Sequence, residues 1–175
     1  MATSDIQVMP QKVFWNGIEL GGTSGGIEMT TETSTVDILS DQTGSEILDS
    51  FQTGTTATVT MTLLELNTVN YNLMIASATG ASMATPEGNT GYGWGSSRNF
   101  TSMLARAQVL ELRDNTSAVN SNSWNFWKAL PIVDSLSFAS DSANTMSVTF
   151  RCFKDSSKDS TVDLLVKGDQ DDTWT

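Results

Sequence analysis

The chain has 175 residues, with 9 Lys and Arg against 20 Asp and Glu, and its formal net charge is −11. It contains no His and one Cys. This composition excludes a Ser-His-Asp triad, an imidazole general base, a His-ligated metal and a cysteine-built zinc site. Few cations are available to neutralise phosphates, which argues against a protein that wraps nucleic acid. We therefore expect no catalytic residues, no cofactor and no metal.

A length of 175 residues fits one domain, residues 1–175, with a core of its own. The start, MATSDIQVMP, has neither the basic nor the apolar region of a signal peptide. No apolar run approaches the roughly 20 residues that cross a bilayer. We expect synthesis in the cytoplasm, no membrane insertion, and a mobile acidic tail at residues 168–175.

The first predicted strand covers residues 13–20, which are aromatic and branched, and the Gly-rich residues 21–26 predict a turn. A second strand is predicted at residues 27–39. Its apolar positions change parity midway, which predicts a β-bulge near residues 33–35. The opposite face of its first half is polar and partly acidic, with Glu28, Thr30, Glu32 and Ser34.

Residues 40–54 are predicted to form a long connection whose apolar side chains need a partner. The clearest strand follows, because Ala57, Val59, Met61 and Leu63 alternate with Thr56, Thr58, Thr60 and Thr62. One short helix is predicted at residues 68–77, capped by Asn67 or Thr68.

In the second half, residues 80–98 predict a long polar loop and residues 105–113 a strand that is buried on both faces at its end. Residues 114–123 predict a polar connection. Two strands follow, residues 130–138 with Leu130, Ile132, Leu136 and Phe138 on one face, and residues 145–153 with Met146, Val148, Phe150 and Cys152 on one face. Six or seven strands and one helix indicate a mainly β fold, a small sandwich or partly open barrel with a short flanking helix.

Three patterns suggest chemistry, and each has a simpler interpretation that we favour. The glycines of GYGWG (Gly91, Gly93, Gly95) lack the flanking strand, helix and Lys of a phosphate-binding loop. The tail carboxylates Asp169, Asp171 and Asp172 lack the pattern of an EF-hand and are expected to be solvated. Asp41, Glu46 and Asp49 contain the pair of carboxylates that glycoside hydrolysis needs, but carboxylates in surface loops are common.

Of the five tryptophans, Trp15, Trp124 and Trp127 lie in or beside predicted strands and are expected to be core or interface anchors. Trp94 and Tyr92 lie in the Gly-rich loop and are candidates for stacking a sugar. Two matches to the glycosylation pattern begin at Asn99 and Asn115, and carry no weight without a secretory signal. Cys152 alternates with core residues and is expected to be a buried thiol.

The order of elements between residues 13 and 66 matches a known pattern. A Gly-containing strand hairpin leads to an acidic strand, then to the loop Asp41-Gln42-Thr43-Gly44, then to a strand and a short helix. The strand carries the spaced residues Gly54, Val59, Leu63 and Glu65. In this order the chain resembles the major tail tube proteins of tailed bacteriophages.

The resemblance implies a structural virion protein that forms hexameric rings, which stack into a tail tube through which DNA leaves the head. The expected location is the virion tail, assembled in the host cytoplasm. The expected partners are tape-measure, tail terminator and baseplate or tip proteins, with a sheath as a further possibility. DNA is expected to pass without specific binding.

Two groups of site residues follow from this resemblance together with the strand patterns. The polar rows are candidates for the channel lining: Glu28, Glu32, Thr56, Thr58, Thr60 and Thr62. The long connection is the candidate contact between rings or subunits: Asp41, Gln42, Gly44, Ile47, Leu48 and Phe51.

Two alternatives remain open. The first is a tube protein of a phage-tail-like contractile injection or secretion system, which carries protein or no cargo. The second is a carbohydrate-binding β-sandwich that uses Trp94 and Tyr92.

Overall fold

The computed structural model describes residues 11–40, 46–79, 81–84, 90–93, 99–114 and 123–168. The expected mainly β fold is confirmed. The strands are β1 (Gln11–Trp15), β2 (Ile18–Glu19), β3 (Thr23–Ser40), β4 (Glu46–Leu63), β5 (Ala81–Ala84), β6 (Thr90–Gly93), β7 (Gln108–Asp114), β8 (Trp124–Ser137), β9 (Thr145–Phe153) and β10 (Leu165–Lys167). The helical segments are α1 (Thr68–Tyr71), the π-helix η2 (Asn72–Thr79) and the 3-10 turn η4 (Leu104–Arg106).

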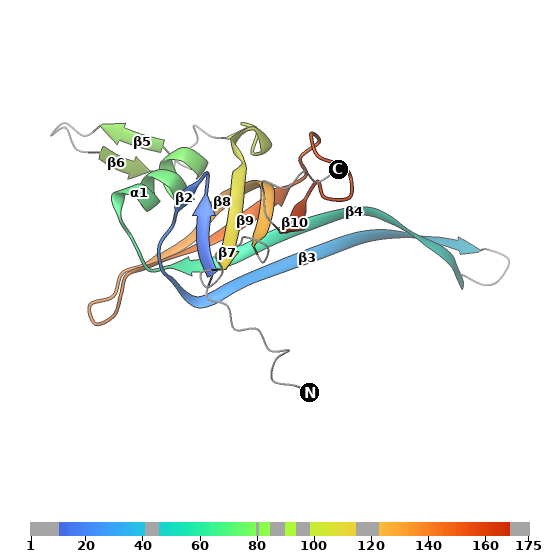
Figure 1. The fold of residues 1–175 in the computed structure, drawn as a ribbon, viewed down its shortest axis with the longest axis horizontal. Helices are drawn as coiled ribbons and strands as arrows, with labels where there is room; N and C mark the ends of the chain where they lie inside the picture. Colours follow the sequence, from blue (N-terminus) through green and yellow to red (C-terminus); the bar gives the residue numbers. More distant parts are fainter. Residues whose placement is uncertain are drawn as a thin grey trace.

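One antiparallel sheet contains eight of these strands, in the order β2-β1-β7-β8-β9-β4-β3, with β10 paired to β8. The sheet is open, because β2 and β3 at its two ends do not pair with each other in the described part of the chain. β5 and β6 form a separate hairpin. The hairpin of β3 and β4 extends well beyond the other strands (Figure 1).

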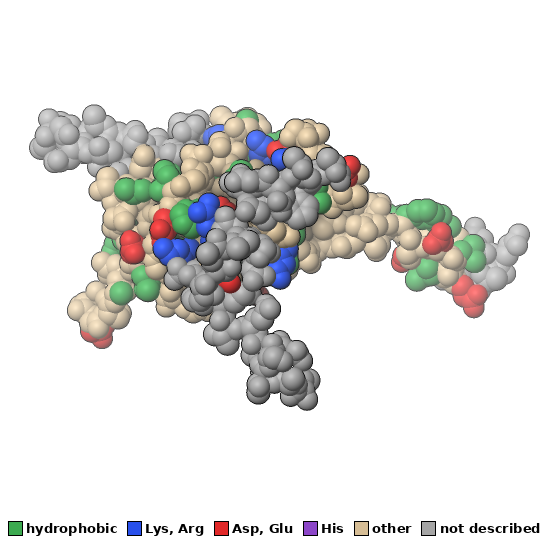
Figure 2. Space-filling view, viewed as in Figure 1, with side chains coloured by type: hydrophobic (Ala, Val, Ile, Leu, Met, Phe, Trp, Pro, Cys, Tyr) green, Lys and Arg blue, Asp and Glu red, His purple; other side chains and the backbone are tan. Residues whose placement is uncertain are grey.

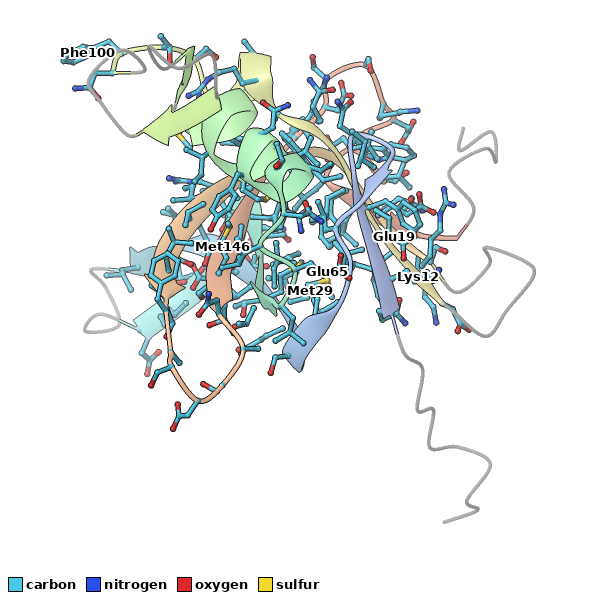
Figure 3. All side chains as sticks on the ribbon, turned by 90° about the vertical axis from the view of Figure 1, so that its left-hand side faces the viewer. Lys12, Glu19, Met29, Glu65, Phe100 and Met146 are labelled. Carbon is cyan, nitrogen blue, oxygen red and sulfur yellow. The ribbon has the colours of Figure 1, made fainter. Side chains whose placement is uncertain are left out.

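The core lies on one face of this sheet. As predicted, Ala57, Val59, Met61 and Leu63 of β4 are buried, and so are Met146, Val148, Phe150 and Cys152 of β9. Leu73 and Met74 of η2 belong to the same core cluster. The helical segment lies over the sheet in the end-on view, whereas the fully exposed Phe100 stands away from it (Figure 3).

The single strand predicted at residues 13–20 is wrong. Asn16 and Gly17 have φ of 54° and 74°, and they turn the chain between β1 and β2. A two-residue hairpin turn of type I′ requires positive φ at both central residues, and Asn-Gly is its usual sequence. The aromatic and branched residues on both sides hid this signal.

The predicted connection at residues 40–54 is also wrong over most of its length. Ser40 belongs to β3 and residues 46–54 belong to β4, and the two strands remain paired out to Ser40 and Glu46. The predicted bulge is confirmed in position, since the register shifts between Ser34 and Thr35. The extra residue is on β4, however, so β3 keeps its alternation through this point.

The predicted helix begins where expected, and Asn67 is its cap: its side chain accepts a hydrogen bond from the Asn70 backbone N–H at 2.9 Å. Four residues are α-helical, and the segment continues as the π-helix η2 to Thr79. The buried Asn70 side chain donates to the carbonyls of Leu20 and Glu65, at 2.9 and 2.6 Å. This amide ties the chain before β3 to the chain after β4.

Three elements differ from prediction in the second half. Residues 80–98 contain the β5–β6 hairpin and are not a loop throughout. β8 begins at Trp124, six residues before the predicted strand, and β10 was not predicted. Gly168, at the start of the predicted mobile tail, is held because its N–H donates to the Ser123 carbonyl at 2.9 Å. Residues 169–175 lie outside the described part.

The predicted face of β8 is wrong as well. The register with β9 shifts between Val133 and Ser135, so residues on the two sides of Asp134 change faces. Ile132 pairs with Thr149 on the polar side, whereas Leu136 pairs with the buried Met146 on the core side. A bulge of this kind inserts one residue and reverses the alternation.

Candidate functional site

The predicted channel-lining residues lie together on the face of the sheet opposite the core. Glu28 pairs with Thr60, Thr30 with Thr58, and Glu32 with Thr56. β9 extends this surface, because Thr149 pairs with Thr60 and Arg151 with Thr58. We call this surface the threonine face; its members are Glu28, Thr30, Glu32, Thr56, Thr58, Thr60, Thr62, Asp134, Thr149 and Arg151.

Hydrogen bonds link neighbouring strands across the threonine face. The hydroxyls of Thr60 and Thr149 are 3.3 Å apart, and Thr149 donates to the Asp134 carboxylate at 2.7 Å. Three carboxylates therefore accompany one guanidinium on this surface: Glu28, Glu32 and Asp134 with Arg151. Thr149 and Arg151 were not predicted, although the polar residues that alternate with Met146 and Val148 carried that signal.

The threonine face lies on four neighbouring strands, β3, β4, β9 and β8. The two outer edges of this four-stranded region have no strand partner among the described residues. β3 pairs with β4 alone over its whole length. On the opposite side, residues 130–137 of β8 pair with β9, whereas β7 and β10 reach only the earlier half of β8. Unpaired backbone N–H and C=O groups along such edges invite pairing with another chain.

The projecting end of the long hairpin carries a cluster of exposed apolar side chains. We call it the arm: residues 35–40 of β3 with residues 46–52 of β4, a ribbon about 20 Å long. Six of its apolar side chains are between 46% and 65% exposed: Val36, Ile38, Leu39, Ile47, Leu48 and Phe51. They gather at the far end of the molecule (Figure 2). Contiguous exposed apolar surface of this kind marks an interaction site.

The predicted contact residues Ile47, Leu48 and Phe51 are thus on the arm, whereas Asp41, Gln42 and Gly44 lie outside the described residues. Val36, Ile38 and Leu39 belong to the same cluster and were not predicted as contacts. Their alternation in the sequence is equally typical of a half-buried strand. In the single chain these residues are exposed because the two strands of the arm pair only with each other among the described residues.

Two of the carboxylates that suggested enzyme-like chemistry lie in the described part of the chain. Glu46 and Asp49 are exposed on the arm, and Asp41 is outside the described residues, as are Trp94 and the tail carboxylates. No group of His, Cys, Asp and Glu suited to a metal occurs in the described part. No helix in that part is long and apolar enough to span a membrane.

Trp15 and Trp127 are buried, as predicted. The indole N–H of Trp15 donates to the Ala129 carbonyl at 2.9 Å, and that of Trp127 to the Val162 carbonyl at 2.7 Å. Cys152 is 5% exposed, and burial raises its thiol pKa to about 12. Such a thiol stays protonated and is inert at neutral pH.

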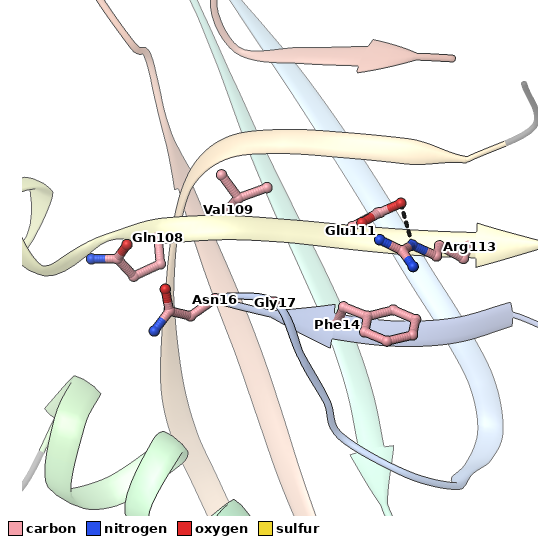
Figure 4. Close-up of a pocket in the computed structure, with 7 residues that line it drawn as sticks. All are labelled: Phe14, Asn16, Gly17, Gln108, Val109, Glu111 and Arg113. Carbon is pink, nitrogen blue, oxygen red and sulfur yellow. Dashed lines mark hydrogen bonds and ion pairs between the residues drawn. The ribbon is translucent and has the colours of Figure 1, made fainter. Parts of the chain in front are cut away.

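A cleft of about 250 Å³ lies on the outer side of β1 and β7 (Figure 4). The Arg113 guanidinium lies 4.4 Å from the centre of the Phe14 ring, and its Nε is 2.6 Å from the Glu111 carboxylate. The buried Glu111 is thereby paired, which is the condition for burying a carboxylate. This pair accounts for the charged groups of the cleft without a ligand.

Comparisons with known proteins extend the description of the fold. No family model matches the sequence, and no curated protein matches it. Among solved structures, the chain is similar to one from the sheath-tube complex of an extracellular contractile injection system, PVC, in its extended state. The TM-score is 0.53 at 11% identity, over 88% of this chain and 95% of the other. This likeness shows a shared fold.

Proposed function

We propose that the chain is the tube subunit of a phage tail, in which six copies join into a ring and rings stack into a hollow tube. One observation carries the proposal: among the described residues, the two outer edges of the four-stranded region β3-β4-β9-β8 have no strand partner. An interface between two different edges of the same subunit generates a ring when its rotation closes.

The strand directions are compatible with this closure. β3, β4, β9 and β8 alternate in direction, so β8 runs antiparallel to β3. A rotation about the tube axis preserves these directions. The free edge of β8 in one copy therefore meets β3 of the next copy as an antiparallel pair, and one continuous barrel results. Closure also removes both edges, which are a liability in a single chain.

The arm supplies the second contact that a tube needs. It extends past the sheet, and its apolar side chains have no partner within the described chain. We assign it to the contact with a subunit of the neighbouring ring, where the six apolar residues become buried. Burying a Leu or Ile side chain stabilises by about 1.5–3 kcal/mol.

The threonine face is assigned to the channel. Its carboxylates Glu28, Glu32 and Asp134 outnumber the single Arg151, so a passing DNA phosphate meets mostly repulsion, within a screening length of about 8–10 Å. In this proposal the wall conducts DNA because it does not hold it. The virion tail is the corresponding location, with tape-measure, terminator and baseplate proteins at the ends of the tube.

A second candidate is the tube of a phage-tail-like contractile injection system, whose cargo is protein. The likeness to a chain of an injection-system complex favours it. The two candidates share the ring and the stack and differ in cargo. Neighbouring genes for a portal favour the phage tail, and neighbouring effector genes favour the injection system.

The first experiment is negative-stain electron microscopy of the purified full-length protein at high concentration, with its mass measured in solution. Six-membered rings or hollow tubes are expected. A monomer that does not polymerise, even when tail initiator proteins are added, contradicts the tube and favours a binding module instead.

A further inference from the structure

Arg151 differs from most other cations of the described chain. Lys12, Arg113 and Lys154 are in ion pairs, and Lys158 lies over the Trp127 ring at 4.1 Å. The exposed Arg151 side chain has no ion pair, hydrogen bond or ring contact within the described residues. Its five N–H donors are therefore available to a ligand.

Arg151 also lines a hollow of about 420 Å³ in the threonine face. Its neighbour across the strands is Thr58, and Thr56 lines the same hollow. Neither hydroxyl has a hydrogen-bond partner in the described part of the chain. Ile132 and Phe153 provide apolar surface in the hollow. One guanidinium and two hydroxyl donors thus face one space.

This donor set matches a tetrahedral oxyanion. The planar guanidinium binds two oxygens of a phosphate side by side, and hydroxyls donate to the remaining oxygens. We propose that the hollow around Arg151 binds a phosphoryl group, with Arg151 as the charged donor and Thr58 and Thr56 as the hydroxyl donors.

Glu32 sets a limit on this binding. Its carboxylate lines the same hollow, but no ion pair joins it to Arg151. It therefore repels the anion without neutralising the guanidinium. The site is built for brief contact: one cation attracts the phosphoryl group and one carboxylate shortens its stay. Removing the Arg151 charge is expected to lower the affinity for the phosphoryl group, and removing the Glu32 charge is expected to raise it.

The source of the phosphoryl group is either free phosphate or the backbone of a nucleic acid. The inference that the phosphoryl group belongs to cargo in a channel rests on the proposed function. Binding of a phosphoryl group by the isolated chain does not depend on that function. In a ring, the Arg151 residues form a narrow cationic band between carboxylates on both sides. Such a band touches each passing phosphate without retaining it.

The test is an NMR titration of the ¹⁵N-labelled full-length protein at low concentration. The probes are inorganic phosphate and a short oligothymidylate, each compared with chloride at equal ionic strength. In the wild-type protein we expect shifts at residues 58 and 151. Arg151→Gln is expected to abolish them, and Glu32→Gln to strengthen binding about fivefold, the effect of removing one nearby like charge. The control, Lys12→Gln, removes an equal charge on β1 and is expected to leave the shifts at residues 58 and 151 unchanged.

Tighter binding of the oligonucleotide than of phosphate supports the backbone as the source, and binding of phosphate alone supports a free anion. Equal binding by wild type and Arg151→Gln, or equal shifts with chloride, overturns the inference. The two proposals fail separately. Tubes without phosphate binding refute only this site, and phosphate binding by a chain that never forms rings refutes only the tube.

Discussion

The Asn70 amide shows how one buried polar side chain joins two distant parts of the chain. It is 1% exposed and donates to carbonyls 50 and 5 residues away in sequence. A buried polar group is favourable when its hydrogen bonds are complete, and its removal leaves both acceptors unsatisfied. The connections on either side of the β3–β4 hairpin depend on it.

Replacing Asn70 with Ala is expected to lower the free energy of unfolding by about 2–4 kcal/mol, because two carbonyls lose their donor and a cavity remains. Urea unfolding followed by circular dichroism measures the change. The control is Asn72→Ala, an exposed position two residues along the same helical segment, with an effect below about 0.5 kcal/mol. Equal effects of the two substitutions would refute the structural role of Asn70.

The Cys152 thiol gives a pH dependence with a definite sign. Burial raises its pKa from 9.0 to about 12, so the folded chain keeps the proton that the unfolded chain loses. Its contribution to stability is complete below pH 9 and declines as the pH rises from 9 towards 12. At pH 8 a thiol reagent is expected to leave the native protein unmodified and to label one thiol per chain in urea. Rapid labelling of the native protein contradicts the burial.

At the scale of elements, the arm is the feature that a single chain leaves unexplained. Its two strands pair with each other and with nothing else in the described chain, and its apolar side chains face water. An isolated two-stranded ribbon is marginally stable at best. We therefore expect the arm to become ordered against another subunit, and its substitution to affect assembly rather than folding.

The double substitution Ile47→Asp and Leu48→Asp tests this expectation. Both side chains are at least 60% exposed, so the free energy of unfolding is expected to change by less than about 0.5 kcal/mol. Tubes are expected to disappear from electron micrographs, because two carboxylates then enter an apolar contact. The matched control, Ser140→Asp with Ser142→Asp, adds the same charge to the exposed β8–β9 turn. Tubes that persist in the arm variant contradict the assignment.

At the scale of the whole molecule, function in this proposal depends on where charge is placed when copies assemble. The threonine face carries little positive charge, and repeating it around a ring multiplies the local field. The net charge of −11 is therefore less informative than the position of a few carboxylates on one face.

Reversing the charge of that face, with Glu28→Lys and Glu32→Lys, is expected to slow or trap DNA during ejection. Lysines neutralise DNA phosphates, and this binding releases the counterions of the phosphates. The rate of ejection is therefore expected to depend more steeply on salt concentration. Ejection kinetics of phage that carry the variant measure the effect. The control, Asp141→Lys with Asp159→Lys, changes the net charge equally away from the threonine face. Unchanged kinetics and salt dependence in the Glu28 and Glu32 variant would show the idea to be wrong.

The sequence by itself determined the strands that bury one face in the core of a single chain and expose the other to water. β4 and β9 alternate between the core and the polar face, and that period of two is visible without coordinates. The helix start was visible too, because Asn67 caps it locally. The same alternation placed Glu28 and Glu32 in one polar row and the four threonines in another, and pairing of β3 with β4 joins the two rows into one surface.

Only the tertiary structure decided the rest. The β4 half of the arm, the β5–β6 hairpin and β10 have no strong local period, and each is fixed by pairing with another strand. The bulge at Asp134 reverses one face of β8 through a single inserted residue. Arg151 lines one hollow with Glu32 and Thr58 because β9 pairs with β4 and β4 with β3, although β9 is far from both in the sequence. Contacts of this kind depend on sheet order, which no local pattern encodes.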